Sequence, residues 1–211
     1  MRSTFWKSYA VSLIFCLTLT ASAQQRPTGA GQQAAAAALV QYEQLLQATT
    51  DLHKKFYLTR KAAGAALAAG ESDKAKTYSQ ALLEQAAEMR GDWNYGNAIH
   101  VANLILGQIA LNSGNVAEAK RLLLEAGKTP GSPQLNSFGP NMLLAKELLA
   151  KGEGEAVVQY FDLCANFWKD GADKLGAWKA YVQKGGVPDF GANLNYLLAD
   201  WRFENWDRLR S

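Results

Sequence analysis

Apolar residues recur every three or four positions along most of this chain, and that period predicts helices. Between residues 34 and 70 no proline interrupts the pattern. This stretch predicts one long helix, or two helices that meet near residues 49–51, where Asp51 would cap the second. Further helices are predicted at 72–89, 97–112, 116–126, 140–150, 155–169, 173–184 and 192–209. We therefore expect an all-α fold.

The composition supports helices and a packed core. Alanine and leucine dominate, with 35 and 28 residues, against only 5 prolines, and both are strong helix formers. Hydrophobic residues make up 48% of the chain and charged residues 19%, which is not the composition of a disordered protein. A β-sandwich or barrel would show more β-branched runs and turn dipeptides.

The N-terminus has the pattern of a signal peptide. Arg2 and Lys7 precede a short apolar run at residues 10–19, and the small-x-small site Ala-Ser-Ala ends at Ala23. The apolar run is shorter than the ~20 residues that span a bilayer, so we expect cleavage after Ala23 rather than a membrane anchor. Residues 1–23 would then be removed, and the mature protein would be periplasmic or secreted, with no transmembrane segment.

Charge and cysteine content exclude several functions. Beyond residue 23 the chain carries 20 basic and 19 acidic side chains, and no basic stripe suggests nucleic-acid binding. Only Cys164 remains after cleavage, so no internal disulfide can form, and its place in a helical apolar pattern predicts a buried thiol. Two histidines are too few for a typical zinc site. We expect no metal and no cofactor.

Three glycines close similar segments of the chain and indicate a repeat. Gly70, Gly114 and Gly152 each follow an apolar helix and precede a polar turn and a second helix, at spacings of 44 and 38 residues. Self-similarity of this length is typical of a helical solenoid. The expected organisation is a signal peptide at 1–23, a flexible linker at 24–33, a helical repeat domain at 34–186 and an aromatic C-terminal capping helix at 187–211.

The middle of the chain resembles the tetratricopeptide repeat family. In residues 100–131, Leu106-Gly107 matches the Leu-Gly of the family pattern, and Ala119 with Leu123 matches its A-x3-F. Asn103 departs from the family's tryptophan. Weaker matches lie around Gly70 and Gly152. The spacings exceed the family's 34 residues, so extra loop or helix is expected at 90–97 and 128–139.

The resemblance implies an antiparallel helix-pair solenoid, a right-handed superhelix with a long N-terminal helix and C-terminal helices as caps. Gly107 and Ala119 would lie where two helices cross closely. It also implies a scaffold that binds a partner protein or peptide on its concave surface, without bond chemistry. The groove positions carried over from the family are Tyr57, Arg60, Leu104, Gln108, Asn112, Met142 and Lys146.

Two alternatives remain beside this hypothesis. His100 follows Asp92 in the chain, and an Asp–His pair together with the long loop 128–141 would suit an enzyme or a small-ligand binder. Phe203 and Trp206, on the predicted terminal helix, could instead bind a partner or mediate self-assembly into a homo-oligomer. His53 falls on an apolar stripe and is interpreted as a partly buried structural histidine.

Overall fold

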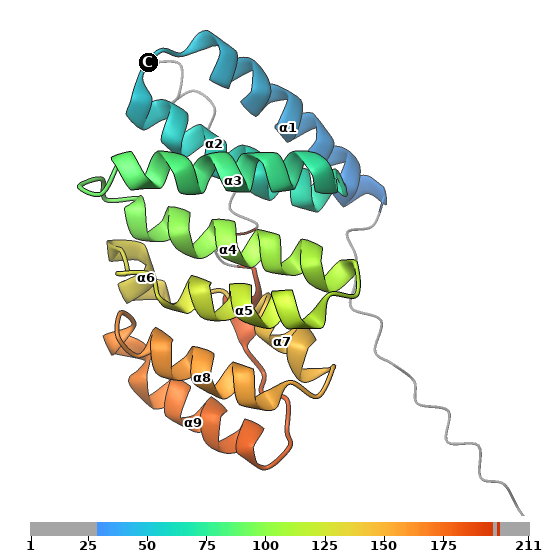
Figure 1. The fold of residues 1–211 in the computed structure, drawn as a ribbon, viewed down its shortest axis with the longest axis vertical. Coiled ribbons are helices and arrows are strands. Elements are labelled where there is room, and N and C mark those ends of the chain that lie inside the picture. The colour runs from blue at the N-terminus through green and yellow to red at the C-terminus, as the bar shows by residue number, and fades with distance from the viewer. Residues whose placement is uncertain (1–28, 196–197, 199–211) are drawn as a thin grey trace, which may run out of the picture.

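The computed structural model describes residues 29–195 and Leu198, and every regular element within them is helical (Figure 1). The prediction of an all-α fold is therefore confirmed for this part of the chain. The elements are α1 (Gly29–Ala48), α2 (Leu52–Ala69), α3 (Ser72–Glu88), α4 (Tyr95–Asn112), α5 (Val116–Gly127), α6 (Pro133–Phe138), α7 (Leu143–Leu149), α8 (Gly154–Cys164), the 3-10 helix η1 (Lys169–Gly171), α9 (Ala172–Gln183) and the 3-10 helix η2 (Gly191–Leu194).

The helices stack in chain order along the long axis of the molecule (Figure 1). From α1 to α5 each helix packs on the next, and α8 then packs on α5 and α9 on α8. The short helices α6 and α7 belong to the connection between α5 and α8, and α7 contacts α4, α5 and α8. Each helix therefore buries its apolar side against its neighbours in the stack.

The three glycines of the repeat pattern occupy equivalent turns. Gly70, Gly114 and Gly152 follow α2, α4 and α7 with φ of 81°, 82° and 83°, a left-handed conformation that favours glycine. In each turn the residue after the glycine donates its N–H to a carbonyl five residues earlier, as in a Schellman motif. These bonds run from Glu71 to Ala66 (2.9 Å), from Asn115 to Ala110 (2.8 Å) and from Glu153 to Leu148 (3.0 Å). The sequence repeat is thus a repeat of helix, left-handed turn and helix.

Two predicted boundaries differ from the structure at the ends of the described region. The linker predicted at 24–33 is wrong for residues 29–33, which form the first turns of α1. The alanine run that follows at 34–38 favours helix, and the helix extends back from it across Gly29 and Gly31. The helix predicted at 192–209 is wrong where it begins, because residues 191–194 form the 3-10 helix η2 and Asn195 lies in a turn. Residues 1–28, 196–197 and 199–211 lie outside the described residues.

Between α1 and α2 the chain forms two helices rather than one. The break falls at residues 49–51, and the Asp51 carboxylate accepts a hydrogen bond from the N–H of Lys54 at 2.9 Å. This bond satisfies one of the free N–H groups at the start of α2. The same kind of cap starts α6, where Ser132 Oγ accepts from Leu135 N at 3.0 Å and Pro133 occupies the first turn, as the Ser-Pro pair predicts.

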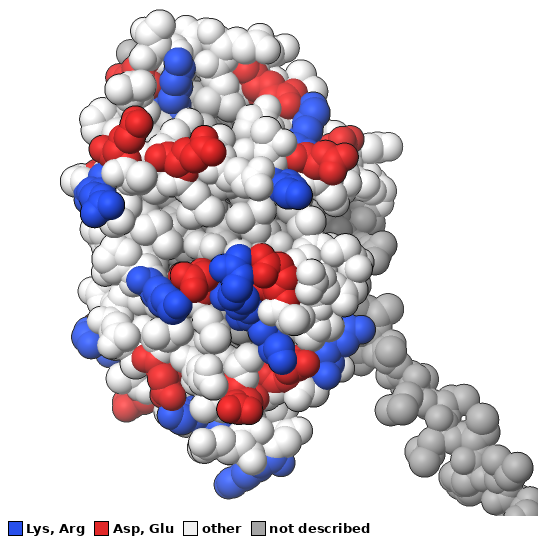
Figure 2. Space-filling view, viewed as in Figure 1, with Lys and Arg blue, Asp and Glu red and all other residues white. Residues whose placement is uncertain are grey.

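α4 lies at the centre of the molecule. It carries no Asp, Glu, Lys or Arg, and its buried residues lie on nearly all sides of the helix. A helix that is apolar all round is expected only where neighbours cover it on every side, and α2, α3, α5, α6 and α7 all contact α4. Figure 2 shows an uncharged band across the middle of the molecule, with acidic and basic side chains interspersed above and below it.

Gly107 lies where α4 crosses its neighbours closely. A Cβ added there would come within 2.4 Å of Leu144 Cδ2 and 3.3 Å of Leu122 Cβ, and 3.5 Å from the carbonyl oxygen of Ala119. An added methyl group would displace the end of the Leu144 side chain, and a side chain as large as leucine would push α4 away from α5 and α7.

We expect Gly107→Leu to destabilise the protein by ~1–3 kcal/mol, because it overpacks this crossing. For a chain of this size that loss lowers the melting temperature by about 2–4 °C per kcal/mol. Gly176→Leu is the matched control, since Gly176 is exposed on α9 and has no atom within 4 Å of an added Cβ. Equal melting temperatures for the two variants would contradict the close crossing.

Candidate functional site

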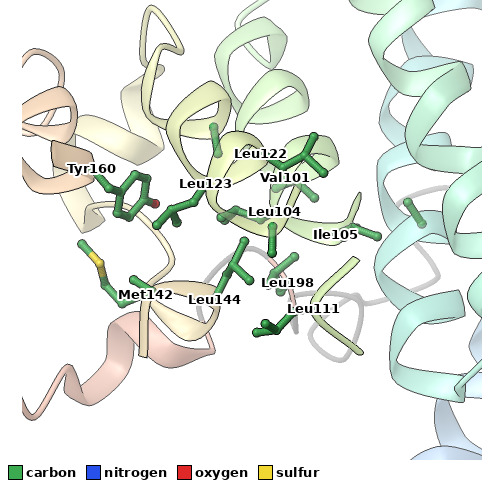
Figure 3. Packing of buried hydrophobic residues seen from close by; sticks show 14 of the residues in the cluster. Val101, Leu104, Ile105, Leu111, Leu122, Leu123, Met142, Leu144, Tyr160 and Leu198 are labelled. Carbon is green, nitrogen blue, oxygen red and sulfur yellow. The ribbon is translucent and has the colours of Figure 1, made fainter. Parts of the chain in front are cut away.

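The predicted groove is not an open surface in the structure. Leu104 and Met142 are both fully buried in the main core cluster. Figure 3 shows Leu104 next to Leu123, and Met142 and Leu144 lining the same apolar interior. The prediction that Leu104 and Met142 face a ligand is wrong, because both residues form part of the core that joins α4 to α7.

The chain fills this region with its own C-terminal segment. Met142 N–H donates to the carbonyl of Asn193 at 2.9 Å. The Asn193 side chain donates to the carbonyls of Phe138 and Pro140 at 3.0 and 2.9 Å. Asn141 returns a bond from its amide to the Leu194 carbonyl at 3.1 Å. These four bonds hold η2 against the loop that precedes α7.

The remaining predicted positions have different exposures. Arg60 and Gln108 are buried, so the prediction that they line an open groove is also wrong, and the Gln108 amide donates to Glu147 on α7. Asn112 is exposed, and Tyr57 and Lys146 are half-buried. A partner-binding role for these three stays a prediction. Phe203 and Trp206 lie outside the described residues.

His100 is a structural residue at the centre of the fold. Its side chain is fully buried, its Nδ1 donates to the Ala126 carbonyl at 3.1 Å, and its Nε2 accepts from the N–H of Asn141 at 3.2 Å. Burial lowers the pKa of His100 to about 4, although the bond to Ala126 opposes this shift. Asp92 does not pair with His100. Since both ring nitrogens are occupied, the hypothesis of a catalytic His100 has no geometric support.

The loop 128–141 also satisfies its polar groups inside the fold. Thr129 Oγ1 donates to the Gly96 carbonyl at 2.7 Å, and Ser132 Oγ donates to Asn97 Oδ1 at 2.7 Å. The carbonyl of Asn141 accepts from the Tyr160 hydroxyl at 2.9 Å. These bonds make the loop a packed connection that ties the start of α4 to α8.

Cys164 is a buried thiol, as predicted. Burial raises the pKa of Cys164 well above its ordinary value, although a hydrogen bond with Tyr160 acts in the opposite direction. The thiolate is the reactive form of cysteine, so this side chain contributes packing rather than nucleophilic chemistry.

The second histidine belongs to a polar cluster at the surface. His53 lies in the first turn of α2 with 74% of its side chain exposed, and its Nδ1 is 2.6 Å from Asp92 Oδ2. The interpretation of His53 as a partly buried residue is wrong, because the helix begins at Leu52 and leaves its first turn open to solvent. Asp92 is itself only 7% exposed, and its Oδ1 accepts the N–H of Asn94 at 2.7 Å. The carboxylate thereby holds the α3–α4 loop against α2.

An open pocket of about 530 Å³ lies between this loop and α2. We call it the Trp93 pocket; it is lined by His53, Phe56, Tyr57, Gly91, Asp92, Trp93 and Asn94. Trp93 is 53% exposed, and its ring lies 6.5 Å from that of Tyr57 at an interplanar angle of 42°. Aromatic side chains with a few polar groups line many ligand sites, and here they line a hollow that is open to solvent.

Asn94 brings an unusual feature to the pocket. The residue is 1% exposed, its Oδ1 accepts from Asn97 Nδ2 at 3.0 Å, and its Nδ2 has no hydrogen-bond partner among the described residues. A buried donor without a partner costs ~1–3 kcal/mol of stability. Ser79, Gln85 and Gln108 also carry a buried polar atom without a partner among the described residues, so the amide adds to the description of the pocket but does not single it out. The exposed Trp93 beside Tyr57 makes the Trp93 pocket the candidate functional site.

Comparisons with models of protein families, with curated proteins and with solved structures found no match for the chain. The argument for function therefore rests on the geometry of the site. Within the described residues, no three His, Cys, Asp or Glu side chains gather as metal ligands, and no helix has the length and hydropathy to cross a membrane.

Sequence reasoning placed Tyr57 near a ligand but did not find the Trp93 pocket. The sequence does contain one local signal. A tryptophan lies in the polar loop RGDWNYG, where few apolar neighbours along the chain can bury it. The partner of Asp92 could not be deduced, since His53 is 39 residues away and their contact depends on how α2 packs against α3 and α4.

Proposed function

We propose that the protein is an exported interaction scaffold that binds a partner protein or peptide in the Trp93 pocket, without bond chemistry. The signal-peptide pattern of residues 1–23 supports export to the periplasm or beyond. The helix–turn–helix repeats closed by Gly70, Gly114 and Gly152 support a solenoid like that of the tetratricopeptide family. Arrays of this kind commonly serve as binding surfaces.

The half-exposed indole of Trp93 is the observation that carries the proposal. Tryptophan is strongly enriched among the residues that dominate binding energy at interfaces. Here the indole stands beside a second aromatic ring and a buried amide without a partner. Asp92 and His53 fix the loop that carries it, so its position is set before a partner arrives and little ordering is needed on binding.

The binding surface of this proposal differs from the concave groove that the family resemblance implies. Leu104 and Met142 form core there, and residues of η2 bond to the adjoining loop. The Trp93 pocket is open to solvent and lies at the α3–α4 loop, one of the two regions where the repeat spacing exceeds that of the family.

We expect Trp93→Ala to lose the partner and Tyr181→Ala to keep it. Tyr181 is the matched control, because it is an aromatic side chain with 55% exposure on α9. Truncation of a tryptophan hot spot costs ~2 kcal/mol or more, or about 30-fold in affinity. The measurement is quantitative capture from envelope extract with the wild-type protein and both variants as bait. Equal capture by wild type and Trp93→Ala would contradict binding at this pocket.

A further inference from the structure

Two cations on α2 are buried on a face where the family resemblance implies an open groove. Arg60 and Lys61 are each 3% exposed. The Arg60 guanidinium carbon lies 5.3 Å from the centre of the Tyr57 ring, and Lys61 Nζ lies 5.2 Å from it. Residues three and four apart are neighbours on a helix surface, so both cations share one side of α2 with Tyr57. Charges buried to this degree are stable only beside opposite charges.

The repeat shows which side of the stack this is. Arg60 precedes Gly70 by ten residues, as Leu104 precedes Gly114, so the two residues occupy equivalent positions on α2 and α4. On α4 this side is covered by the C-terminal part of the chain. Leu198 is 8% exposed and belongs to the same core cluster as Leu104 and Leu111, and Figure 3 shows the three together. The chain has therefore returned from α9 to the inner side of the stack, one helix away from Arg60.

The described carboxylates around α2 are engaged elsewhere or exposed. Neither α2 nor α4 carries one. Glu43 on α1 accepts from Lys74 Nζ and from the Tyr78 hydroxyl, both at 2.9 Å, and Asp92 is bonded to His53. The other carboxylates between the start of α1 and the end of α4 are exposed; they are Asp51, Glu71, Asp73, Glu84 and Glu88. This distribution points to a buried counter-charge from another part of the chain.

The sequence that follows Leu198 carries carboxylates within reach of α2. Asp200 comes two residues after Leu198, and Glu204 comes four residues later, a spacing that suits two neighbouring sites on one helix face. Residues 199–211 lie outside the described residues. Helix α4 packs directly on α2, and packed helix axes are about 8–10 Å apart. Six residues cover about 9 Å even at the short rise of a helix, so Glu204 can reach the buried cations.

We propose that residues 199–211 lie along the inner side of α2, where the carboxylates of Asp200 and Glu204 pair with Arg60 and Lys61. The segment then fills the groove that the family resemblance assigns to a partner, instead of stacking on α9 as an end cap. A partner that binds this inner face must first displace the segment, which makes it an internal competitor. The inference does not depend on the Trp93 pocket, whose own test is the capture of a partner.

Neutralising the two carboxylates tests the ion pairs in the full-length chain. Asp200→Asn/Glu204→Gln leaves both cations buried without their counter-charges, so we expect the melting temperature to fall by about 6 °C or more. Glu84→Gln/Glu88→Gln, at two exposed carboxylates of α3, is the matched control and should melt like wild type. A C-terminal variant that also melts like wild type overturns the proposal.

The complementary change separates pairing from a general loss of stability. Adding Arg60→Met/Lys61→Met to the C-terminal variant removes the unpaired charges, so the fourfold variant should melt at a higher temperature than Asp200→Asn/Glu204→Gln alone. If the two sets of substitutions lower the melting temperature additively, the four side chains do not interact, and the proposal is wrong.

A spin label locates the segment even if the charge variants do not fold. A nitroxide is attached at Asn205→Cys, next to Glu204, while the native Cys164 is buried and stays unlabelled. We expect the amide NMR signals of residues 57–64 to broaden more than those of α9. Broadening of the α9 signals alone, or of neither set, overturns the proposal. In a mixture of spin-labelled protein and isotope-labelled protein without the spin label, broadening would show that the segment binds a second copy, which overturns the contact within one chain.

Discussion

Replacing Gly96 by alanine should destabilise the protein by about 3 kcal/mol, at the upper end of the usual cost of overpacking. Gly96 lies in the first turn of α4, directly under the loop that follows α5. A Cβ there would stand 1.7 Å from the carbonyl oxygen of Gly131 and 2.4 Å from its carbonyl carbon. These are backbone atoms, so no side-chain rotation relieves the clash.

The neighbours of Gly96 have little freedom to move away. Thr129 Oγ1 donates to the carbonyl of Gly96 at 2.7 Å. Gly131 is itself packed on Phe167, because a Cβ added to Gly131 would lie 2.7 Å from Phe167 Cβ. A shift of the loop therefore breaks a buried hydrogen bond, worth ~1 kcal/mol, or disturbs the contact with Phe167. Both consequences add to the steric cost of Gly96→Ala.

The measurement is thermal unfolding of Gly96→Ala beside Gly176→Ala. Gly176 is exposed within α9 and nothing lies within 4 Å of an added Cβ, so alanine there should be neutral or stabilise by up to ~1 kcal/mol. For a chain of this size we expect Gly96→Ala to melt about 6–12 °C below wild type. If Gly96→Ala and Gly176→Ala have the same melting temperature, the loop that contains Gly131 does not pack on α4.

Local chemistry explains which parts of the fold the sequence predicts. Asp51, Ser132 and Gly114 act on backbone groups within a few residues of themselves. Their roles as caps and turns therefore follow from residue type and spacing alone. Gly107 was predictable in the same way, because only a small residue suits a helix crossing, although its contact with Leu144 depends on the position of α7.

The candidate site could not be predicted because its contacts join distant segments. The Asp92 carboxylate was expected near His100, eight residues along the chain, yet it bonds to His53. Likewise Leu104 and Met142 were expected on a groove because the family resemblance assigns helix faces by repeat position. Here the loop before α7 and η2 cover that side, and neither element belongs to the repeat pattern.

Acidification from pH 7.5 to 5 should remove about 2 kcal/mol of the free energy of unfolding through His100 alone. The pKa of His100 is lowered by burial from 6.5 to about 4 in the folded protein, while the unfolded chain keeps the ordinary value. Between these two values the unfolded state binds a proton that the native state does not. The stabilisation is thus complete above pH 6.5, falls as the pH drops, and is reduced by roughly 3 kcal/mol at pH 4.

The physical reason for this penalty lies in the two bonds of the imidazole. The neutral ring donates from Nδ1 to Ala126 and accepts at Nε2 from the N–H of Asn141. A protonated ring would place a second N–H against that of Asn141, inside an apolar core, where a charge is strongly disfavoured.

Urea unfolding of wild type, His100→Gln and His53→Gln at a series of pH values measures the effect. His100→Gln should be less stable at pH 7.5 but should lose most of the dependence above pH 5, and His53→Gln should keep it. A dependence that persists unchanged in His100→Gln, or an NMR titration of the His100 ring with a midpoint near 6.5, would contradict this account.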